Sequence, residues 1–245
     1  MQGQIVVVTG GSGGIGSHIC QHLARAGATV VLTYRTRKQS AQRVIEALPG
    51  KDHWAKHVAV DESAALKILA AEVDSRHGRC DVLVNCAGTT RFVPHAELEA
   101  LDDELIDEIF RVNWRGPFAA IRAFRPLLSG RGNGLVVNIS SIAGVTGMGS
   151  NVAYCASKAA LDCMTKSLAR ALAPEIRVVS VSPGLVDTEF VRGLDQKWRD
   201  EQAARTPLRR LATPDEVGAA VVAVATTLTY SNGCVIPVDG GRPLG

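Results

Sequence analysis

The stretch QIVVVTGGSGGIG, residues 4–16, decides the fold of this chain. Its first half is a run of mostly β-branched residues, which is typical of a short strand buried on both faces. A glycine-rich turn follows at once, and residues 17–26 have the composition of a helix that ends at Gly27. With a second apolar strand over residues 28–34, the segment makes a strand–helix–strand unit of about 30 residues. Such a unit is the usual start of a dinucleotide-binding domain.

The same alternation continues to the end of the chain. Further helices are predicted over residues 38–48, 63–76, 102–128 (with an interruption near Gly116-Pro117), 153–173 and from 213 onward. Further strands are predicted over residues 54–60, 82–85, 135–139, 176–181 and 234–236. Seven apolar strands that alternate with six helices indicate an α/β fold, in which helices cover both faces of a parallel sheet.

Nothing in the sequence divides the chain, because it has no linker, internal repeat or low-complexity tract. We therefore expect residues 1–245 to form one domain. The least regular segment, residues 187–211, carries charged and aromatic residues between a strand and a helix. This segment is a candidate substrate lid.

Composition limits the function. Hydrophobic residues make up 46% of the 245 positions and charged residues 21%, which indicates a sizeable core and argues against disorder. A net charge of +3 is too small to indicate a nucleic-acid partner. The first residues lack a basic segment followed by an apolar one, and no apolar run approaches about 18 residues. These features predict a soluble, cytoplasmic protein that contacts no membrane.

The cysteine and histidine spacing predicts no metal site. Six cysteines, at positions 20, 80, 86, 155, 163 and 234, form no C-x-x-C pair and are expected to be free, buried thiols. His18 and His22 have a spacing that could bind a metal on the first helix. Because no acidic or cysteine ligand is evident beside them, we interpret them as part of a solvated helix face.

A tyrosine and a lysine stand four positions apart at Tyr154 and Lys158, within the helix predicted over residues 153–173. Residues four apart lie on one face of a helix, so both side chains can act on one small volume. A cation near a phenol lowers its pKa from about 10, which makes the phenol a usable acid or base nearer neutral pH. Taken alone, the pair fits an ordinary amphipathic helix as well, so the rest of the chain has to decide.

The glycine-rich turn fits two dinucleotide-binding patterns. One uses Gly11, Gly13 and Gly16, and the other uses Gly10, Gly14 and Gly16. In either pattern, backbone N–H groups can approach a pyrophosphate at the positive end of the following helix.

The end of the second strand indicates which dinucleotide binds. Binding sites for NAD usually place an acidic residue there, whereas this chain has Tyr34-Arg35-Thr36-Arg37. Arginines near the adenosine ribose favour a 2′-phosphate through charge-assisted hydrogen bonds. The sequence therefore predicts NADP(H) as the cofactor. The alternative is that Arg35 and Arg37 only begin a solvated helix.

Together these residues resemble the short-chain dehydrogenase/reductase family. The resemblance rests on Thr9-Gly10-x-x-x-Gly14-Ile15-Gly16, Asn85-Cys86-Ala87-Gly88, Asn113, Ser141, Tyr154-x-x-x-Lys158, Pro183-Gly184 and Val238-Asp239-Gly240-Gly241, in this order. It selects the second glycine pattern. It also implies a single doubly wound Rossmann-like domain and an NAD(P) cofactor.

The family implies roles for individual residues. Tyr154 would exchange a proton with the substrate oxygen, and Ser141 would hydrogen-bond that oxygen. Lys158 would hold the nicotinamide ribose and depress the pKa of Tyr154, and Asn113 would anchor a water in a proton relay. The implied cofactor-binding set is Gly10, Ser12, Gly13, Gly14, Ile15, Gly16, Tyr34, Arg35, Asp61, Asn85, Ala87, Gly88, Tyr154, Lys158, Pro183, Gly184, Val186 and Thr188.

Two positions depart from the family pattern. Cys86 replaces the second of two asparagines that are usual after the fourth strand, so this turn is expected to be held differently. The aspartate that usually contacts adenine falls at Ala59, while Asp61 lies two positions later. Either Asp61 reaches the adenine or backbone contacts from Val60 remain.

Within the family, the chain is most similar to 3-oxoacyl-(acyl-carrier-protein) reductases, through the glycine turn, the Ser141–Tyr154 spacing and the stretch Thr206-Pro207-Leu208-Arg209-Arg210. This similarity implies NADPH-dependent reduction of 3-oxoacyl thioesters, as in fatty acid biosynthesis. The alternatives are a sugar or secondary-alcohol dehydrogenase and a non-catalytic, cofactor-binding regulator.

The family also suggests partners. Four basic residues on predicted helices could dock an acidic acyl carrier protein or could equally form a solvated face: Arg122, Arg125, Lys166 and Arg170. A homotetramer is implied, with one interface on helices 102–128 and 153–173 and another on the C-terminal strand.

Overall fold

The computed structural model describes residues 1–244, which form one parallel sheet of seven strands in the order β3-β2-β1-β4-β5-β6-β7. The strands are β1 (Ile5–Thr9), β2 (Thr29–Tyr34), β3 (Trp54–His57), β4 (Val82–Asn85), β5 (Gly134–Ile139), β6 (Ile176–Pro183) and β7 (Val235–Val238). Every residue of the central strands β1, β4 and β5 is buried, as expected for a sheet that is covered on both faces. The predicted parallel sheet is confirmed.

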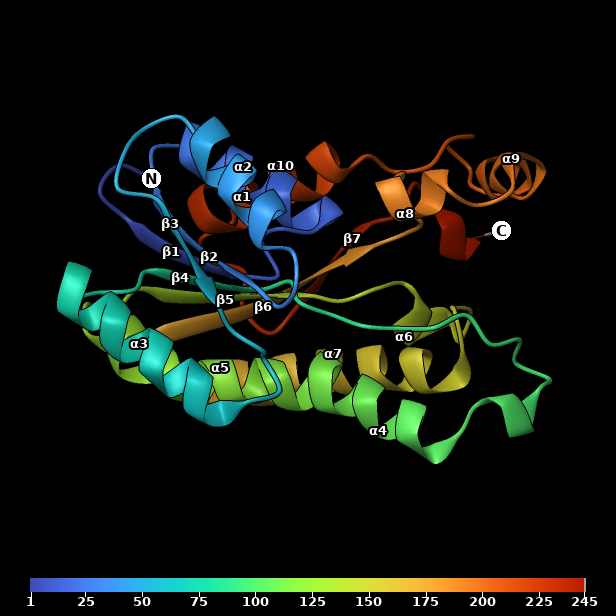
Figure 1. Ribbon diagram of the computed structural model, residues 1–245, viewed down its shortest axis with the longest axis horizontal. Coiled ribbons are helices and arrows are strands. Elements are labelled where there is room, and N and C mark those ends of the chain that lie inside the picture. Colours follow the sequence, from blue (N-terminus) through green and yellow to red (C-terminus); the bar gives the residue numbers. More distant parts are fainter. Residues whose placement is uncertain (245) are drawn as a thin grey trace.

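Helices cover both faces of the sheet (Figure 1). One layer contains α1 (Gly14–Arg25), α2 (Lys38–Ala47) and α10 (Pro214–Thr226). The other contains α3 (Ser63–His77), α4 (Asp103–Phe110), α5 (Gly116–Ser129) and α7 (Val152–Ala171). The first layer buries Leu23 and Val221 against the sheet, and the second buries Phe124 and Leu161. This is the doubly wound arrangement that the family resemblance implied.

The strand order places a ligand crevice at a particular edge. The chain progresses from β1 to β3 toward one side of the sheet and then returns to lay β4 on the other side of β1. In doubly wound sheets, ligands bind outside the carboxyl ends of the strands at such a reversal. Thr9 and Asn85 end β1 and β4 in register, so the turns that follow them lie side by side at this edge.

Two predicted segments differ in detail. The helix predicted over residues 102–128 is interrupted by a π-helical turn, Arg111–Arg115, directly before the expected position at Gly116. The segment 187–211, predicted to be irregular, contains the short helices α8 (Glu189–Arg192) and α9 (Gln196–Ala204). A backbone bridge between Val186 and Ala212 joins the two ends of this segment. A further short helix, α6 (Ala143–Thr146), follows β5.

The cysteines are free thiols, as predicted, but they are not all buried. Cys163 is exposed on α7, which corrects the expectation for this residue. Burial raises the pKa of the Cys20 and Cys80 thiols far above the usual range, so these two thiols stay protonated and unreactive. In the described part of the chain, no helix combines the length and the apolar character needed to cross a membrane.

Candidate active site

The glycine turn after β1 is packed too closely for side chains. Gly10 has a φ of +68°, and a Cβ placed there would come within 2.8 Å of the Ala87 Cα. A Cβ on Gly16 would lie 2.3 Å from the Gly10 carbonyl oxygen. A Cβ on Gly14 would lie 3.2 Å from the Thr188 side chain. These contacts give a physical reason for glycine at the positions that the family resemblance selected.

The first turn of α1 is open to an anion. Its N-cap is Gly13, and within residues 1–244 no side chain caps this helix. The first N–H groups of a helix carry partial positive charge and need acceptors. A groove of about 270 Å³ opens beside them, lined by Ser12, Gly13, Gly14, Ser17, Gln21, Arg37, Ser40, Arg43, Val44, Ala47 and Glu189. Glycines, hydroxyls and two arginines around a bare helix N-terminus fit the phosphates of a dinucleotide.

The turn after β4 is held by a hydroxyl group. The Thr9 Oγ1 accepts hydrogen bonds from the backbone N–H groups of Cys86 and Ala87, over 3.1 and 3.2 Å. The Thr9 side chain therefore holds this turn through its backbone N–H groups, although Cys86 lacks the amide that the family usually has there. The result is a close approach of Ala87 to Gly10, which joins the two turns into one wall of the crevice.

Tyr154 and Lys158 lie at the amino end of α7, beside this wall. The helix begins there because Asn151 caps it, with Oδ1 accepting from the Tyr154 N–H over 2.7 Å. The Lys158 Nζ lies 5.8 Å from the centre of the Tyr154 ring and donates a hydrogen bond to the Ile139 carbonyl oxygen over 2.8 Å. The helical spacing thus brings the two groups together, as the sequence indicated.

Burial dominates the titration of both groups. It lowers the pKa of Lys158 to about 8, although Cys86 and Asp162 oppose the shift. It raises the pKa of Tyr154, while a hydrogen bond with Ser141 acts in the opposite direction. Lys158 is not among the groups that shift the Tyr154 pKa here, so its lowering of that pKa stays a prediction. A raised pKa keeps the Tyr154 phenol protonated at neutral pH.

Asn113 lies in the π-helical turn and is fully buried. Its side chain makes two hydrogen bonds with the Thr89 backbone. The Thr89 N–H donates to Asn113 Oδ1 over 2.8 Å, and Asn113 Nδ2 donates to the Thr89 carbonyl oxygen over 3.0 Å. A Cβ placed on Gly88 would meet Asn113 Oδ1 at 3.3 Å and Lys158 Nζ at 3.9 Å. Gly88 therefore lies between Asn113 and Lys158, and π-helical turns of this kind are frequent at functional sites.

The comparisons with known proteins agree with this geometry. A family model described as enoyl-(acyl carrier protein) reductase matches residues 10–242. The chain superimposes on a short-chain dehydrogenase/reductase structure from Burkholderia xenovorans with a TM-score of 0.92 and 35% identity, over 99% of this chain and 98% of that one. The chain belongs to the short-chain dehydrogenase/reductase family. Members of this family are oxidoreductases that use NAD(P).

This chain has two relatives that are named for an activity. It is 35% identical over 246 residues to the 3-oxoacyl-(acyl-carrier-protein) reductase FabG of Thermotoga maritima, covering 98% of both chains. It is 33% identical over 246 residues to an acetoacetyl-CoA reductase of Allochromatium vinosum, covering 97% of this chain and 98% of that one.

Several predicted cofactor residues of this chain have other partners. Arg35 pairs with Glu108 across 3.7 Å, and the Tyr34 ring packs edge-on against His57. Asn85 donates to Asn138 over 2.9 Å. These contacts turn Arg35 toward α4 rather than toward the groove at α1, where Arg37 and Arg43 lie instead.

Other predicted residues retain free binding capacity. Among the described residues, Asp61 Oδ1 and Asn85 Oδ1 are buried oxygens without a hydrogen-bond partner. Asp61 also lies 3.8 Å from Arg111 through its other oxygen, which fixes its position. At the far wall, Pro183 ends β6 and Gly184 follows it, Val186 is buried, and Thr188 caps α8 beside Gly14. Unpartnered acceptors are consistent with contacts to the amino and hydroxyl groups of a bound dinucleotide.

Some contacts could not be read from the sequence. Asp215, at the start of α10, accepts from His18 over 3.1 Å and from His22 over 3.0 Å. These two hydrogen bonds connect α1 to α10, which corrects the interpretation of His18 and His22 as part of a solvated helix face. Within residues 1–244, no group of three or more potential ligands is arranged to hold a metal. The sequence also did not indicate that Arg43 lines the groove, because this depends on how α2 packs beside α1.

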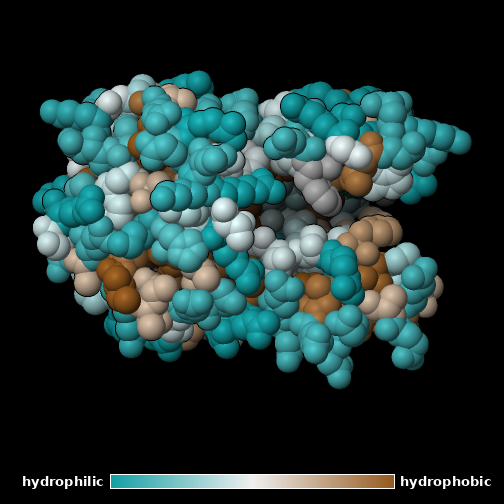
Figure 2. Space-filling model, in the orientation of Figure 1, coloured by the Kyte–Doolittle hydropathy of each residue, from teal (hydrophilic) through white to brown (hydrophobic). Residues whose placement is uncertain are grey.

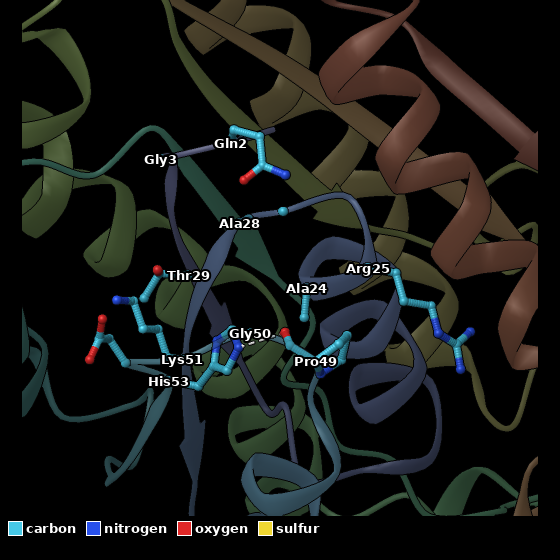
Figure 3. A pocket seen from close by; sticks show the side chains of 12 residues that line it. Gln2, Gly3, Ala24, Arg25, Ala28, Thr29, Pro49, Gly50, Lys51 and His53 are labelled. Atoms are coloured by element: carbon cyan, nitrogen blue, oxygen red, sulfur yellow. Dashed lines mark hydrogen bonds between the residues drawn. The ribbon is translucent and has the colours of Figure 1, made fainter.

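A larger hollow lies away from this site. It has a volume of about 500 Å³ and is lined by residues at or just before the starts of β1, β2 and β3, including Gln2, Thr29 and His53 (Figure 3). His53 closes one side of it by hydrogen-bonding to the Pro49 carbonyl oxygen over 3.0 Å. This hollow is at the amino ends of the strands, whereas the residues that resemble the family motifs lie at the carboxyl ends.

Proposed function

We propose that this chain is an NADPH-dependent carbonyl reductase whose leading substrates are 3-oxoacyl thioesters of acyl carrier protein or CoA. The observation that carries the proposal is the meeting of Tyr154, Ser141 and Lys158 at the crevice beside the glycine turn. The activities for which the Thermotoga and Allochromatium relatives are named support the same substrate class.

The residues of the crevice fit a dinucleotide. The glycine turn and the open first turn of α1 would hold the pyrophosphate. Lys158 would hold the nicotinamide ribose, and the unpartnered oxygen of Asp61 would accept from the adenine amino group. When bound, the nicotinamide supplies the hydride that the protein itself lacks.

The side chains of the protein then supply position and charge stabilisation. During reduction, negative charge develops on the carbonyl oxygen of the substrate. Hydrogen bonds from Ser141 and Tyr154 stabilise this charge in the transition state. Tyr154 then gives its proton to the oxygen, a role that suits a phenol whose raised pKa keeps it protonated at neutral pH. Asn113, buried beside Gly88 and Lys158, would anchor the water that returns the proton.

The groove beside α1 supports a preference for NADPH. Arg37 and Arg43 line it together with Ser12 and Ser40, and Arg43 donates to the Ser40 hydroxyl over 3.2 Å. Two guanidinium groups and two hydroxyls are suitable partners for the 2′-phosphate that distinguishes NADPH from NADH. We therefore assign phosphate recognition to Arg37 and Arg43, and not to Arg35.

Exposed apolar side chains near the catalytic residues support an acyl substrate over a sugar. Val145, Met148 and Val152 lie between Ser141 and Tyr154, and Leu194 and Trp198 lie in the segment 187–211. Figure 2 shows a cleft between the part of the molecule that carries α8 and the part that carries α6, with hydrophobic residues on both walls. An apolar cleft binds an acyl chain by removing its surface from water, whereas polyols need polar partners.

A substrate panel tests the proposal. Initial rates of NADPH oxidation with acetoacetyl-CoA and with longer 3-oxoacyl thioesters are compared with rates of NADP⁺ reduction with polyols and secondary alcohols. We expect kcat/KM for the thioesters to exceed that for every polyol by at least about 100-fold, because the apolar cleft contributes binding energy only to the acyl chain. Faster polyol oxidation would favour the sugar dehydrogenase alternative, and no turnover with any compound would favour a regulator.

A further inference from the structure

A buried carboxyl group lies one helical turn beyond Lys158. Asp162 is on α7, and only 6% of its surface is exposed. Among residues 1–244, neither of its oxygens has a hydrogen-bond partner, and none of the ion pairs within 4.0 Å includes Asp162. An unpaired buried carboxyl group is costly, because burial removes the water that would stabilise its charge. Such a group needs an explanation, and the mechanism above does not use it.

A row of buried polar side chains leads toward Asp162 beneath α7. Asn85, Asn138 and Ser180 lie in register on β4, β5 and β6. Asn85 Nδ2 donates to Asn138 Oδ1 over 2.9 Å, and Asn138 Nδ2 donates to Thr165 Oγ1 over 2.8 Å. Thr165 and Ser180 share a further hydrogen bond of 2.9 Å. The core under this part of α7 is therefore polar, which lowers the cost of keeping a charge there.

Two hydroxyl groups lie beside the carboxyl group itself. Burial raises the pKa of Asp162, while Ser140, after the end of β5, and Ser180, on β6, act against this shift. Two ammonium groups on α7, those of Lys158 and Lys166, act in the same direction. These neighbours favour the carboxylate form.

The groups around the Lys158 ammonium come from three elements. Tyr154 and Asp162 face it from α7, the Ile139 carbonyl oxygen from β5 and the Cys86 thiol from the end of β4. The Cys86 thiol is uncharged at neutral pH, because burial raises its pKa to about 12. Within the described chain, Asp162 is therefore the acidic group that opposes the loss of a proton from Lys158.

We propose that Asp162 is a positioning residue that keeps the buried Lys158 side chain protonated without occupying its hydrogen-bond donors. Because the two groups form no direct ion pair, the ammonium protons stay available for the Ile139 carbonyl and for a bound ribose. The attraction over one helical turn still stabilises the charge, since it acts in a poorly solvated interior. The inference rests on the proposed function for the role of Lys158 in the reaction.

The first test measures Lys158 directly in the cofactor-free protein. Protein labelled with ¹⁵N-lysine is titrated by NMR, and the Lys158 signal is assigned from the Lys158→Ala spectrum. We expect titration near pH 8 in the wild type and at least about one unit lower in Asp162→Asn, since that change removes the neighbouring charge and keeps the shape. Thr165→Val, which removes a buried hydroxyl from the same polar row, is the matched control and should leave the titration unchanged.

The second test uses the reaction. In Asp162→Asn, the alkaline limb of the pH profile for thioester reduction should move to lower pH by the same amount, and KM for NADPH at pH 8 should rise several-fold. Asp162→Asn and Asp162→Leu both remove this charge from a buried position, and each variant has to be folded for the comparison with the wild type to hold. A melting temperature for each variant checks this.

The outcomes separate the two proposals. An unchanged Lys158 titration in both Asp162 variants, or an equal shift in Thr165→Val, would overturn the role of Asp162. If the wild type reduced no carbonyl compound, the proposed function would fail, while the NMR titration would still decide whether Asp162 keeps Lys158 charged.

Discussion

Tyr154 and Lys158 lie one turn apart on α7, and burial shifts the pKa of each toward its neutral form. A phenol that stays protonated can donate its proton, which is the role that the proposed function gives to Tyr154. The family resemblance located both residues, since their spacing is local. Their titration could not be predicted, because it depends on desolvation by β5 and on Ser141, which the helix alone does not reveal.

The proposed recognition of the 2′-phosphate of NADPH can also be tested at single residues. Replacing Arg37 or Arg43 by alanine should raise the Kd for NADPH roughly 10-fold each, the usual loss for one charge-assisted hydrogen bond, and leave the Kd for NADH nearly unchanged. Arg35→Ala is the matched control and should affect neither, because Arg35 pairs with Glu108. Cofactor fluorescence titration measures all four proteins. A loss of NADPH affinity confined to Arg35→Ala would contradict the assignment.

At the scale of the elements, the start of helix α10 is stabilised by residues at its own amino end. Thr213 and Glu216 form a capping box, and Arg210 from the segment 187–211 pairs with Glu216. This start was predictable, because a cap, a proline and acidic residues are adjacent in the sequence. The π-helical turn at Arg111–Arg115 could not be predicted, because it accompanies contacts between Asn113 and Thr89, which are 24 positions apart in the sequence. The helices of the segment 187–211 were missed for the same reason, as Arg199 reaches back 12 positions to Asp187.

The capping box gives a prediction at this scale. Thr213→Ala should lower the free energy of unfolding by about 1 kcal/mol at pH 7, whereas the exposed Thr226→Ala in the last turn should change it by less than about 0.5 kcal/mol.

Hydrogen bonds from Arg210 and Thr213 lower the Glu216 pKa to about 2. The stabilisation by Glu216 is therefore present above its ordinary pKa, about 4.5, and is lost as the pH falls toward 2. Urea unfolding of wild type and Glu216→Gln should show a stability gap that closes over this range; a gap independent of pH would refute it.

For the whole molecule, the alternation of strands and helices predicted the layers and the parallel sheet. The strand order brings the turns after β1 and β4 to one edge, and the amino end of α7 lies beside them. Contacts between distant segments, such as Asp215 with His18 and His22, could not be predicted, because 197 and 193 positions separate them. The hollow of about 500 Å³ at the opposite edge is larger than the groove of about 270 Å³ at α1, so the volume of an opening does not by itself mark the site.

At the scale of the whole molecule, the prediction concerns the oligomeric state. We expect a homotetramer, with one interface on α4, α5 and α7 and another at β7 and the C-terminal end. Sedimentation velocity at micromolar concentration should give a species about four times the chain mass of 25.9 kDa. A single monomeric species would contradict the expectation.

Tyr154→Phe tests the central claim most directly. NADPH oxidation with acetoacetyl-CoA is measured for wild type and variant, together with the Kd for NADPH. The claim predicts that the variant binds NADPH with nearly unchanged affinity and loses at least about 100-fold in kcat, because only the transferable proton is removed. Turnover by Tyr154→Phe within about threefold of the wild type would show that this phenol is not the proton donor.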